Sequence, residues 1–168
     1  KIMRLKTLLL GGALLLTSLS WAQTSKTDKV IKGRIEMKTF MNDQDLAWFY
    51  HGVNSYTPND KMVDYIKSNR GKYNIIALIG TWDETSRQLL PKLYKTMILA
   101  SSEEQIMVWG ADEKLQTDAP TDYKLKKVPT FIIMKDGKEE GRLVGESKET
   151  IESEVARLLL KMNRKEKS

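Results

Sequence analysis

Few residues of this chain could do chemistry, and two of them closely follow Trp82. Asp83 and Ser86 lie three positions apart in the run Trp82-Asp83-Glu84-Thr85-Ser86, so on a helix they share one turn. A serine becomes a nucleophile only beside a base, usually histidine, that a third group orients. His51 is the only histidine in the 168 residues, and no motif brings it to Ser86. We therefore predict no catalytic residues and interpret Asp83 as a helix cap, where a carboxylate meets unpaired N–H groups.

The sequence contains no cysteine. Disulfide exchange needs one thiolate to attack and a second thiol to resolve the mixed disulfide, so this chain supplies the means for neither step. Thiolate zinc sites and iron–sulfur clusters are excluded for the same reason, and one histidine leaves little for other transition metals. We expect no metal and no other cofactor.

Two buried strands joined by a helix are predicted around these residues. Residues 73–79 (YNIIALI) form a continuous apolar run, typical of a strand covered on both faces. In residues 84–100 the apolar side chains recur at helical spacing, and Pro91 removes one hydrogen bond, which predicts a kink. Residues 106–111 (IMVWGA) predict a second strand, parallel to the first. The acid after the tryptophan would then lie where the first strand gives way to the helix.

A short helix, a hairpin and a final helix complete the predicted elements. The turn and cap residues 57–60 (TPND) start the short helix. Lys135-Asp136-Gly137-Lys138 predicts a tight turn between antiparallel strands. Ser147 is the predicted cap of the final helix, which carries one apolar stripe. These elements are a helix at 60–69, strands at 131–134 and 142–144, and a helix at 151–162.

The first 22 residues predict a signal peptide. Three basic residues precede a short apolar run, and Ser20-Trp21-Ala22 has the small-x-small pattern of a cleavage site. Only about 15 uncharged residues separate Lys6 from Trp21, whereas a membrane span needs roughly 20 apolar residues. An uncleaved anchor is the alternative. We expect an exported chain, periplasmic or secreted, with no membrane attachment after cleavage.

The charge balance gives no sign of a polyanionic partner. The whole chain carries a formal net charge of +6, and loss of a leader with three basic and no acidic residues leaves +3. No stretch combines lysine and arginine with aromatic residues on one face, and the basic tail at 161–167 is interpreted as a solvated helix end. Nucleic acid is therefore not an expected partner.

Together these segments resemble thioredoxin over roughly residues 60–162. Thioredoxins carry a tryptophan followed by Cys-x-x-Cys at a helix start, and a proline eight positions after the first cysteine. Here Trp82 precedes Asp83-Glu84-Thr85-Ser86, and Pro91 stands eight positions after the first residue of that run. Val128-Pro129-Thr130 resembles the family's cis-proline loop. The resemblance implies an α/β, thioredoxin-like fold with a central mixed β-sheet flanked by helices, preceded by an N-terminal extension.

A narrower resemblance is to exported thioredoxin-like proteins common in Bacteroidetes. These read Gly-Thr-Trp-Cys and later Gly-Lys-Glu-x-Gly-Arg, whereas this chain has Gly80-Thr81-Trp82-Asp83 and, at 137–142, Gly-Lys-Glu-Glu-Gly-Arg. The departures fall on the reactive positions. Asp83 and Ser86 replace the two motif cysteines, and Ala77 replaces the family's buried aspartate. We therefore predict a redox-inactive protein that is not an enzyme.

The predicted domain organisation has three parts. Residues 1–22 are the signal peptide, 23–58 an N-terminal extension and 59–168 the thioredoxin-like domain. Residues 40–56 are rich in aromatic side chains, which either pack on the domain or form a contact surface. We predict packing, because aromatic area is usually buried. The oligomeric state is left open.

The resemblance also implies a binding groove. Family members hold extended polypeptide by backbone hydrogen bonds beside the cis-proline, a mode that needs no cysteine. The residues expected around this groove are Trp82, Asp83, Val128, Pro129 and Thr130. We predict a non-catalytic module of the cell envelope that binds a protein or an extended peptide. A residual or partner-assisted redox role is the alternative, and a proline turn that serves the fold alone is the other interpretation of the groove.

Overall fold

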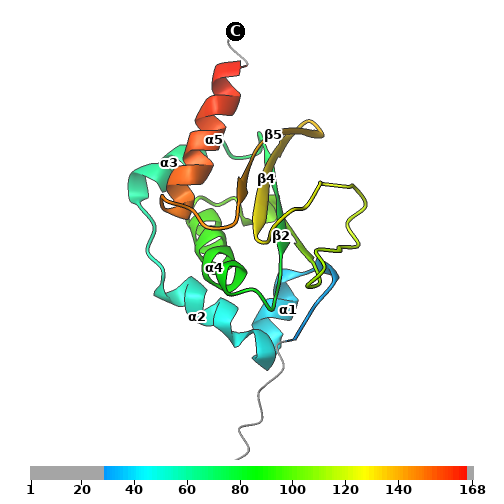
Figure 1. Ribbon diagram of the computed structural model, residues 1–168. Coiled ribbons are helices and arrows are strands. Elements are labelled where there is room, and N and C mark those ends of the chain that lie inside the picture. The colour runs from blue at the N-terminus through cyan, green and yellow to red at the C-terminus, as the bar shows by residue number, and fades with distance from the viewer. Residues whose placement is uncertain (1–28, 166–168) are drawn as a thin grey trace, which may run out of the picture.

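A five-stranded mixed sheet forms the centre of the protein (Figure 1). The structure is a computed structural model that describes residues 29–165, so the predicted signal peptide lies outside it. The strands are β1 (Gly33–Ile35), β2 (Asn74–Ile79), β3 (Ile106–Gly110), β4 (Thr130–Lys135) and β5 (Lys138–Val144). Their order in the sheet is β1-β3-β2-β4-β5. β2 and β3 are parallel, and the other neighbouring pairs are antiparallel.

The α-helices of the described chain pack on one face of this sheet (Figure 1). They are α1 (Met37–Asn42), α2 (Ala47–Ser55), α3 (Asp60–Ser68), α4 (Glu84–Leu99) and α5 (Ile151–Lys165), with 3-10 turns at Gln44–Leu46 and Glu103–Gln105. One continuous buried cluster joins all five helices to the sheet. Among residues 29–165 no helix combines the length and apolarity that a membrane crossing requires.

β2 is buried on both faces, as its apolar run predicts. Ile75, Ala77 and Ile79 belong to the cluster under the helices. Ile76 and Leu78 belong to a second cluster on the opposite face, because successive side chains of a strand point to opposite sides. β2 is therefore the middle strand of the sheet and also lies between the two buried clusters.

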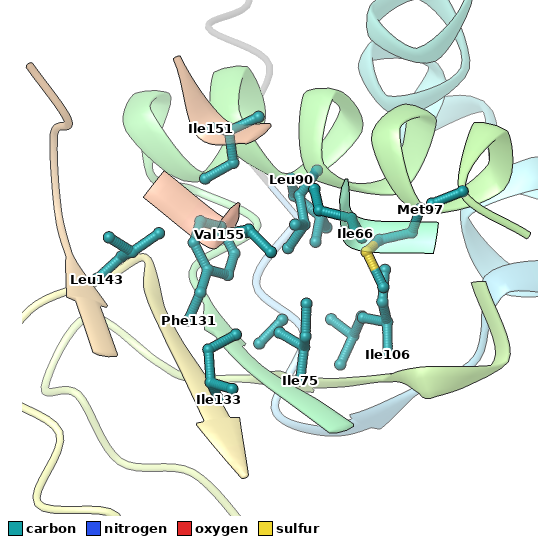
Figure 2. Close-up of a cluster of buried hydrophobic side chains, with 14 of the residues drawn as sticks. Ile66, Ile75, Leu90, Met97, Ile106, Phe131, Ile133, Leu143, Ile151 and Val155 are labelled. Carbon is teal, nitrogen blue, oxygen red and sulfur yellow. The ribbon is translucent and has the colours of Figure 1, made fainter. Parts of the chain in front are cut away.

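The core under the helices is mainly aliphatic (Figure 2). Leu90 and Met97 of α4 point toward the sheet, where Ile75 and Phe131 meet them, and Val155 of α5 closes the side. Each of these side chains is at most 1% exposed. Such packing holds α4 on β2 and so fixes where the first turn of the helix lies relative to the strand before it.

A long connection, and not a helix of the described chain, covers the other face of the sheet. Residues 111–129 cross it without a helix or a strand, apart from one bridge between Ala111 and Thr117. Tyr123 and Leu125 of this connection pack on the second cluster. The same connection then enters β4 through the predicted proline turn.

The predicted elements are present with ends displaced by a few residues. β2, α4 and β3 follow one another as expected, with β2 and β3 parallel neighbours. In the β4–β5 hairpin, Asp136 and Gly137 have φ values of 48° and 74°, the left-handed pair that a two-residue hairpin turn requires. The prediction that Ser147 caps α5 is wrong. Thr150 precedes the helix and its Oγ1 accepts from the N–H of Ser153, at 3.4 Å.

Part of the predicted N-terminal extension is built into the sheet and the core. β1 pairs with β3, and three residues are too few to show a strand pattern in the sequence. Phe40 and Phe49 are buried and stacked, with ring centroids 4.6 Å apart. Trp48 also packs on the core, which confirms packing for most of the aromatic cluster, while Tyr50 is 50% exposed. The boundary at residue 59 stays a prediction.

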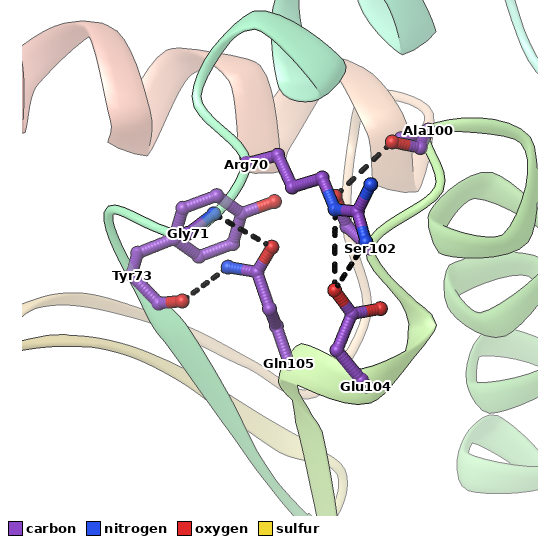
Figure 3. Close-up of polar contacts among 7 residues, drawn as sticks. All are labelled: Arg70, Gly71, Tyr73, Ala100, Ser102, Glu104 and Gln105. Carbon is purple, nitrogen blue, oxygen red and sulfur yellow. Dashed lines mark hydrogen bonds and ion pairs between the residues drawn. The ribbon is translucent and has the colours of Figure 1, made fainter.

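Polar contacts brace the ends at which β2 and β3 begin (Figure 3). The Gln105 amide donates to the carbonyl oxygen of Tyr73 and accepts from the N–H of Gly71 at 3.1 Å. Beside it, Arg70 and Glu104 form an ion pair at 3.1 Å. The two Gln105 bonds pair backbone groups at the end of the sheet opposite to the Trp82 turn, whereas Arg70 and Glu104 are exposed.

A buried carboxylate ties α5 to the connection between α2 and α3. Glu152 is 2% exposed and accepts from Tyr56 Oη at 2.6 Å and from the N–H of Asn59 at 3.0 Å. Burial by itself would raise the pKa of this carboxyl, but the hydrogen bonds outweigh burial and hold the pKa below its ordinary value. The ionised form of Glu152 is therefore part of the folded state.

Replacing Glu152 by glutamine is expected to weaken the loss of stability in acid. Because its pKa is lower in the folded chain, the unfolded chain binds the proton first as pH falls through about 4.3. The stabilisation is present above that pH and is lost as pH falls through the folded-state pKa. Urea unfolding from about pH 7 to about pH 3 should show a shallower decline in Glu152→Gln than in the parent. Glu149→Gln, at an exposed site, is the control, and identical slopes in all three would contradict the assignment.

Candidate functional site

Two turns meet at one end of the sheet. β2 and β4 are antiparallel, with Leu78 opposite Thr130. The residues that follow Leu78 therefore lie beside those that precede Thr130. The register brings the Trp82-Asp83 turn and the Val128-Pro129 turn to the same end, so all five predicted groove residues belong to these two turns or border them.

Asp83 and Ser86 are joined in a closed set of hydrogen bonds. Asp83 caps α4, and its Oδ2 accepts from both the N–H and the hydroxyl of Ser86, each at 2.7 Å. The fully buried Ser86 hydroxyl oxygen in turn accepts from the N–H of Gly80 at 3.1 Å. The N–H of Asp83 donates to the Gly80 carbonyl at 3.0 Å. Both positions that the resemblance aligns with the thioredoxin cysteines are thus used to close a turn.

This arrangement provides no activated nucleophile. The Ser86 hydroxyl donates its proton to Asp83 and has no contact with a histidine. His51 is exposed on α2, with its ring 6.0 Å from that of Tyr50. No three histidine, aspartate or glutamate residues between positions 29 and 165 gather as they would to hold a metal ion.

The Trp82 ring packs against the first turn and is fixed there by a hydrogen bond. Its Nε1 donates to the carbonyl oxygen of Ala111 at 2.9 Å. The ring lies so close to Gly80 that a Cβ there would come within 2.8 Å of Trp82 Cε2. The neighbouring Thr81 is buried, and its hydroxyl accepts from the N–H of Ile31 at 3.0 Å and donates to the Lys29 carbonyl. The turn is therefore bonded both to the segment before β1 and to the residue after β3.

The second turn contains a cis peptide bond between Val128 and Pro129. The carbonyl oxygen of Pro129 accepts from the N–H of Gly145 at 2.7 Å, and Gly145 has a left-handed φ of 67°. The hydroxyl of Thr130 donates to the Lys127 carbonyl at 2.7 Å. These bonds fix the chain on both sides of Val128.

Val128 is itself unpaired. Within residues 29–165 neither its N–H nor its carbonyl has a hydrogen-bond partner. The residue is only 3% exposed, so these groups are also poorly solvated. Buried backbone groups without partners are uncommon because the lost hydration is not replaced. Val128 is therefore a buried place in the second turn where the backbone lacks a hydrogen-bonding partner.

Two adjoining cavities beside the turns were not predicted from the sequence. They have volumes of about 270 and 430 Å³ and lie between α4 and the connection from β5 to α5. Leu89, Glu146, Ser147 and Lys148 line both, and none of the five predicted groove residues lines either. Gly145 lines the smaller one and bonds to Pro129, so the cavities flank the second turn. Their lining comes from segments about 60 residues apart, which no local pattern connects.

The thioredoxin family model matches residues 56–157. The chain belongs to the thioredoxin family. It is 30% identical over 89 residues to thioredoxin H2-2 of Oryza sativa subsp. japonica, which covers 53% of this chain and 64% of the rice protein. An H-type thioredoxin of Fagopyrum esculentum is 27% identical over 86 residues, 51% of this chain and 72% of that protein.

A third relative is a TPR repeat-containing thioredoxin of Arabidopsis thaliana, which is 29% identical over 82 residues. That match covers 49% of this chain and 21% of the Arabidopsis protein. The chain thus spans less than two thirds of this relative and of the rice thioredoxin. Within the thioredoxin family, this chain is one whose 168 residues contain no thiol, so it is unsuited to thiol–disulfide exchange.

The closed set of bonds at the first turn is expected to be cooperative. Ser86→Ala leaves the buried N–H of Gly80 unpaired, which costs about 1–3 kcal/mol of unfolding free energy. Asp83→Ala removes the cap, at about 0.5–2 kcal/mol. Because the two side chains share a hydrogen bond, the double variant should lose less than the sum, by about 0.5 kcal/mol or more. Urea unfolding of the four proteins measures this, with Thr85→Ala as the control, and strict additivity would contradict the shared bond.

Proposed function

We propose that this thioredoxin-family chain is a redox-inactive binding protein that holds an extended segment of another protein at the Val128 turn. The observation that carries the proposal is the unpaired backbone N–H and carbonyl of Val128 beside the cis bond. An extended segment offers the complementary carbonyl and N–H in the spacing of a strand. Binding of this kind needs neither a thiol nor an ionisable group.

The setting of Val128 supports recognition through the backbone. Its position is fixed by the bonds from Thr130 to Lys127 and from Gly145 to Pro129, so little ordering remains to be done when a partner arrives. Trp82 supplies an aromatic surface at the same end of the sheet. Because Val128 is 3% exposed, we infer that a neighbouring side chain moves aside as the segment enters.

Export to the cell envelope is the second part of the proposal. It rests on the basic, apolar and small-residue pattern of residues 1–22 and on the resemblance to exported Bacteroidetes proteins at Gly80-Thr81-Trp82-Asp83 and at 137–142. The partner would then be a periplasmic or secreted polypeptide. The proposed leader would be absent from the mature chain.

A partner-assisted redox role is the second candidate, and membership of the thioredoxin family favours it. In that case the partner supplies both thiols and this chain supplies only the surface that positions them. The two candidates differ in whether reduction of a disulfide is faster in the presence of this chain. That difference is directly measurable.

Insulin reduction by dithiothreitol is expected to proceed at the uncatalysed rate with the parent protein. The double variant Asp83→Cys, Ser86→Cys is expected to accelerate it, since a thiol placed at the start of α4 meets the helix dipole and ionises more readily. Asp83→Asn, Ser86→Ala is the thiol-free control. Acceleration by the parent would remove the redox-inactive proposal, and an inert double cysteine variant would show that the turn no longer has a thioredoxin geometry.

Peptide binding tests the groove directly. A randomised, cysteine-free library of peptides of about nine residues is passed over the immobilised protein, and captured peptides are added to ¹⁵N-labelled protein. We expect the Val128 amide resonance to shift and its exchange with solvent to slow, because a bound strand pairs with it. Trp82→Ala should weaken binding about tenfold, roughly 1.4 kcal/mol, while Tyr50→Ala, an exposed aromatic on α2, should leave it unchanged. Equal binding by both variants, or a shift that spares Val128, would count against this site.

A further inference from the structure

We propose that the segment bound at the Val128 turn is acidic and places a carboxylate against Lys127 and Lys126. This inference rests on the proposed function, because it names the chemistry of the segment that the turn would hold. Three observations carry it: where the Lys127 side chain lies, the lack of a counter-ion there, and the pairing geometry of an extended segment.

The Lys127 side chain lies beside Gly145, whose N–H closes the proline turn by donating to Pro129. The Lys127 carbonyl oxygen accepts from the Thr130 hydroxyl at 2.7 Å, which fixes its backbone. Its side chain covers Gly145, where an added Cβ would come within 2.8 Å of Lys127 Cε and 2.9 Å of Nζ. Gly145 donates its N–H to Pro129 at 2.7 Å. The ammonium group of this exposed lysine thus lies beside the turn.

The cations around the turn have no counter-ion of their own. Lys126, Lys127 and Lys148 are exposed, and within residues 29–165 none of them forms an ion pair. By contrast, Lys124, a few residues earlier in the same connection, pairs with Asp122 at 2.6 Å. Unpaired cations attract a carboxylate over about 8–10 Å at ordinary salt.

The acids that face the same end of the sheet do not cancel these cations. The Asp83 carboxylate is bonded to Ser86, and both Asp83 and Glu84 lie at the positive end of the α4 dipole. Glu146, which follows Gly145, is the exposed acid next to Lys127, and no ion pair joins the two. Glu113, two residues after the Ala111 carbonyl that Trp82 contacts, and Glu149, beside Lys148, are further exposed acids without an ion pair in the described chain. Lys126 and Lys127 directly precede Val128, so the excess of positive charge is local to that turn.

Pairing geometry puts a neighbouring side chain within reach of Lys127. When an extended segment pairs with Val128, the adjacent residue of the segment lies opposite Lys127, with Cβ atoms about 4.5–5.5 Å apart. An aspartate or glutamate at that position stabilises the pair, and a lysine there is repelled. The backbone groups of Val128 thus account for binding, and Lys127 accounts for selection.

Peptide libraries that differ at one position test this selection. Three libraries of about nine residues carry aspartate, asparagine or lysine at the centre, with uncharged, cysteine-free residues elsewhere. The immobilised full chain is expected to retain the aspartate library several-fold better than the asparagine library and the lysine library least. Raising the salt from about 0.05 M to about 0.5 M should remove the difference. Equal retention of all three overturns the acidic preference and leaves the groove standing, whereas retention of none overturns both proposals.

Variants locate the selection at Lys127. Lys127→Gln should reduce the advantage of the aspartate library about two- to fivefold, and Glu146→Gln should increase it by a similar factor. Lys72→Gln, at an exposed lysine before β2 at the opposite end of the sheet, is the matched control and should change nothing. Circular dichroism confirms that each variant is folded. A Lys127→Gln protein that loses all three libraries equally would show a purely structural role for Lys127 and overturn the inference.

Discussion

The placement of β2 between β3 and β4 is the constraint on which the rest of this structure depends. Its apolar run is buried on both faces, and its two edges pair with β3 and β4, so no side of the strand is open to solvent. The parallel partner β3 requires a crossover, and α4 provides it. The antiparallel partner β4 places the Val128-Pro129 turn, which precedes it, beside the Trp82-Asp83 turn, which follows β2. These two adjacent turns form the candidate site.

At the exit of β2, the residues that the resemblance aligns with two cysteines perform a structural task. A helix N-terminus favours a negative group, which in a thiol enzyme lowers the pKa of the attacking cysteine. In this chain the same position holds the Asp83 carboxylate as a cap, and Ser86 joins it to the backbone of Gly80. The electrostatic setting of a reactive site is retained, while the groups placed in it are unable to exchange disulfides.

The parts of the fold that depend on local patterns could be predicted from the sequence. The apolar run of β2, the helical spacing and cap of α4, and the Asp136-Gly137 turn each describe a few adjacent residues. β1 was missed because three residues carry no periodicity, and its pairing with β3 is a long-range choice. The cap of α5 was misassigned because Ser147 and Thr150 are both good caps, and tertiary contacts decide between them.

Local motifs also predicted which residues form the two turns of the candidate site, but not their contacts. The residues of the two turns follow from motifs, but the contacts that give each turn its properties join distant segments. Trp82 to Ala111, Lys127 over Gly145, and the cavities between α4 and the β5–α5 connection have no local signature. Resemblance supplied the positions, and only packing shows which groups at those positions are already committed to a partner.

The absence of thiols and the proposed binding are compatible because the two turns are held by separate hydrogen bonds. The first turn is closed by Asp83, Ser86 and Gly80, and the second by Pro129 with Gly145 and by Thr130 with Lys127. In the described chain none of these bonds crosses between the turns, which the pairing of β2 with β4 brings to the same end of the sheet. The residues at 83 and 86 therefore act on one turn, and the unpaired backbone of Val128 belongs to the other. In the proposed mode of binding, recognition through backbone groups needs no thiol, and the charged side chains around those groups supply the selectivity.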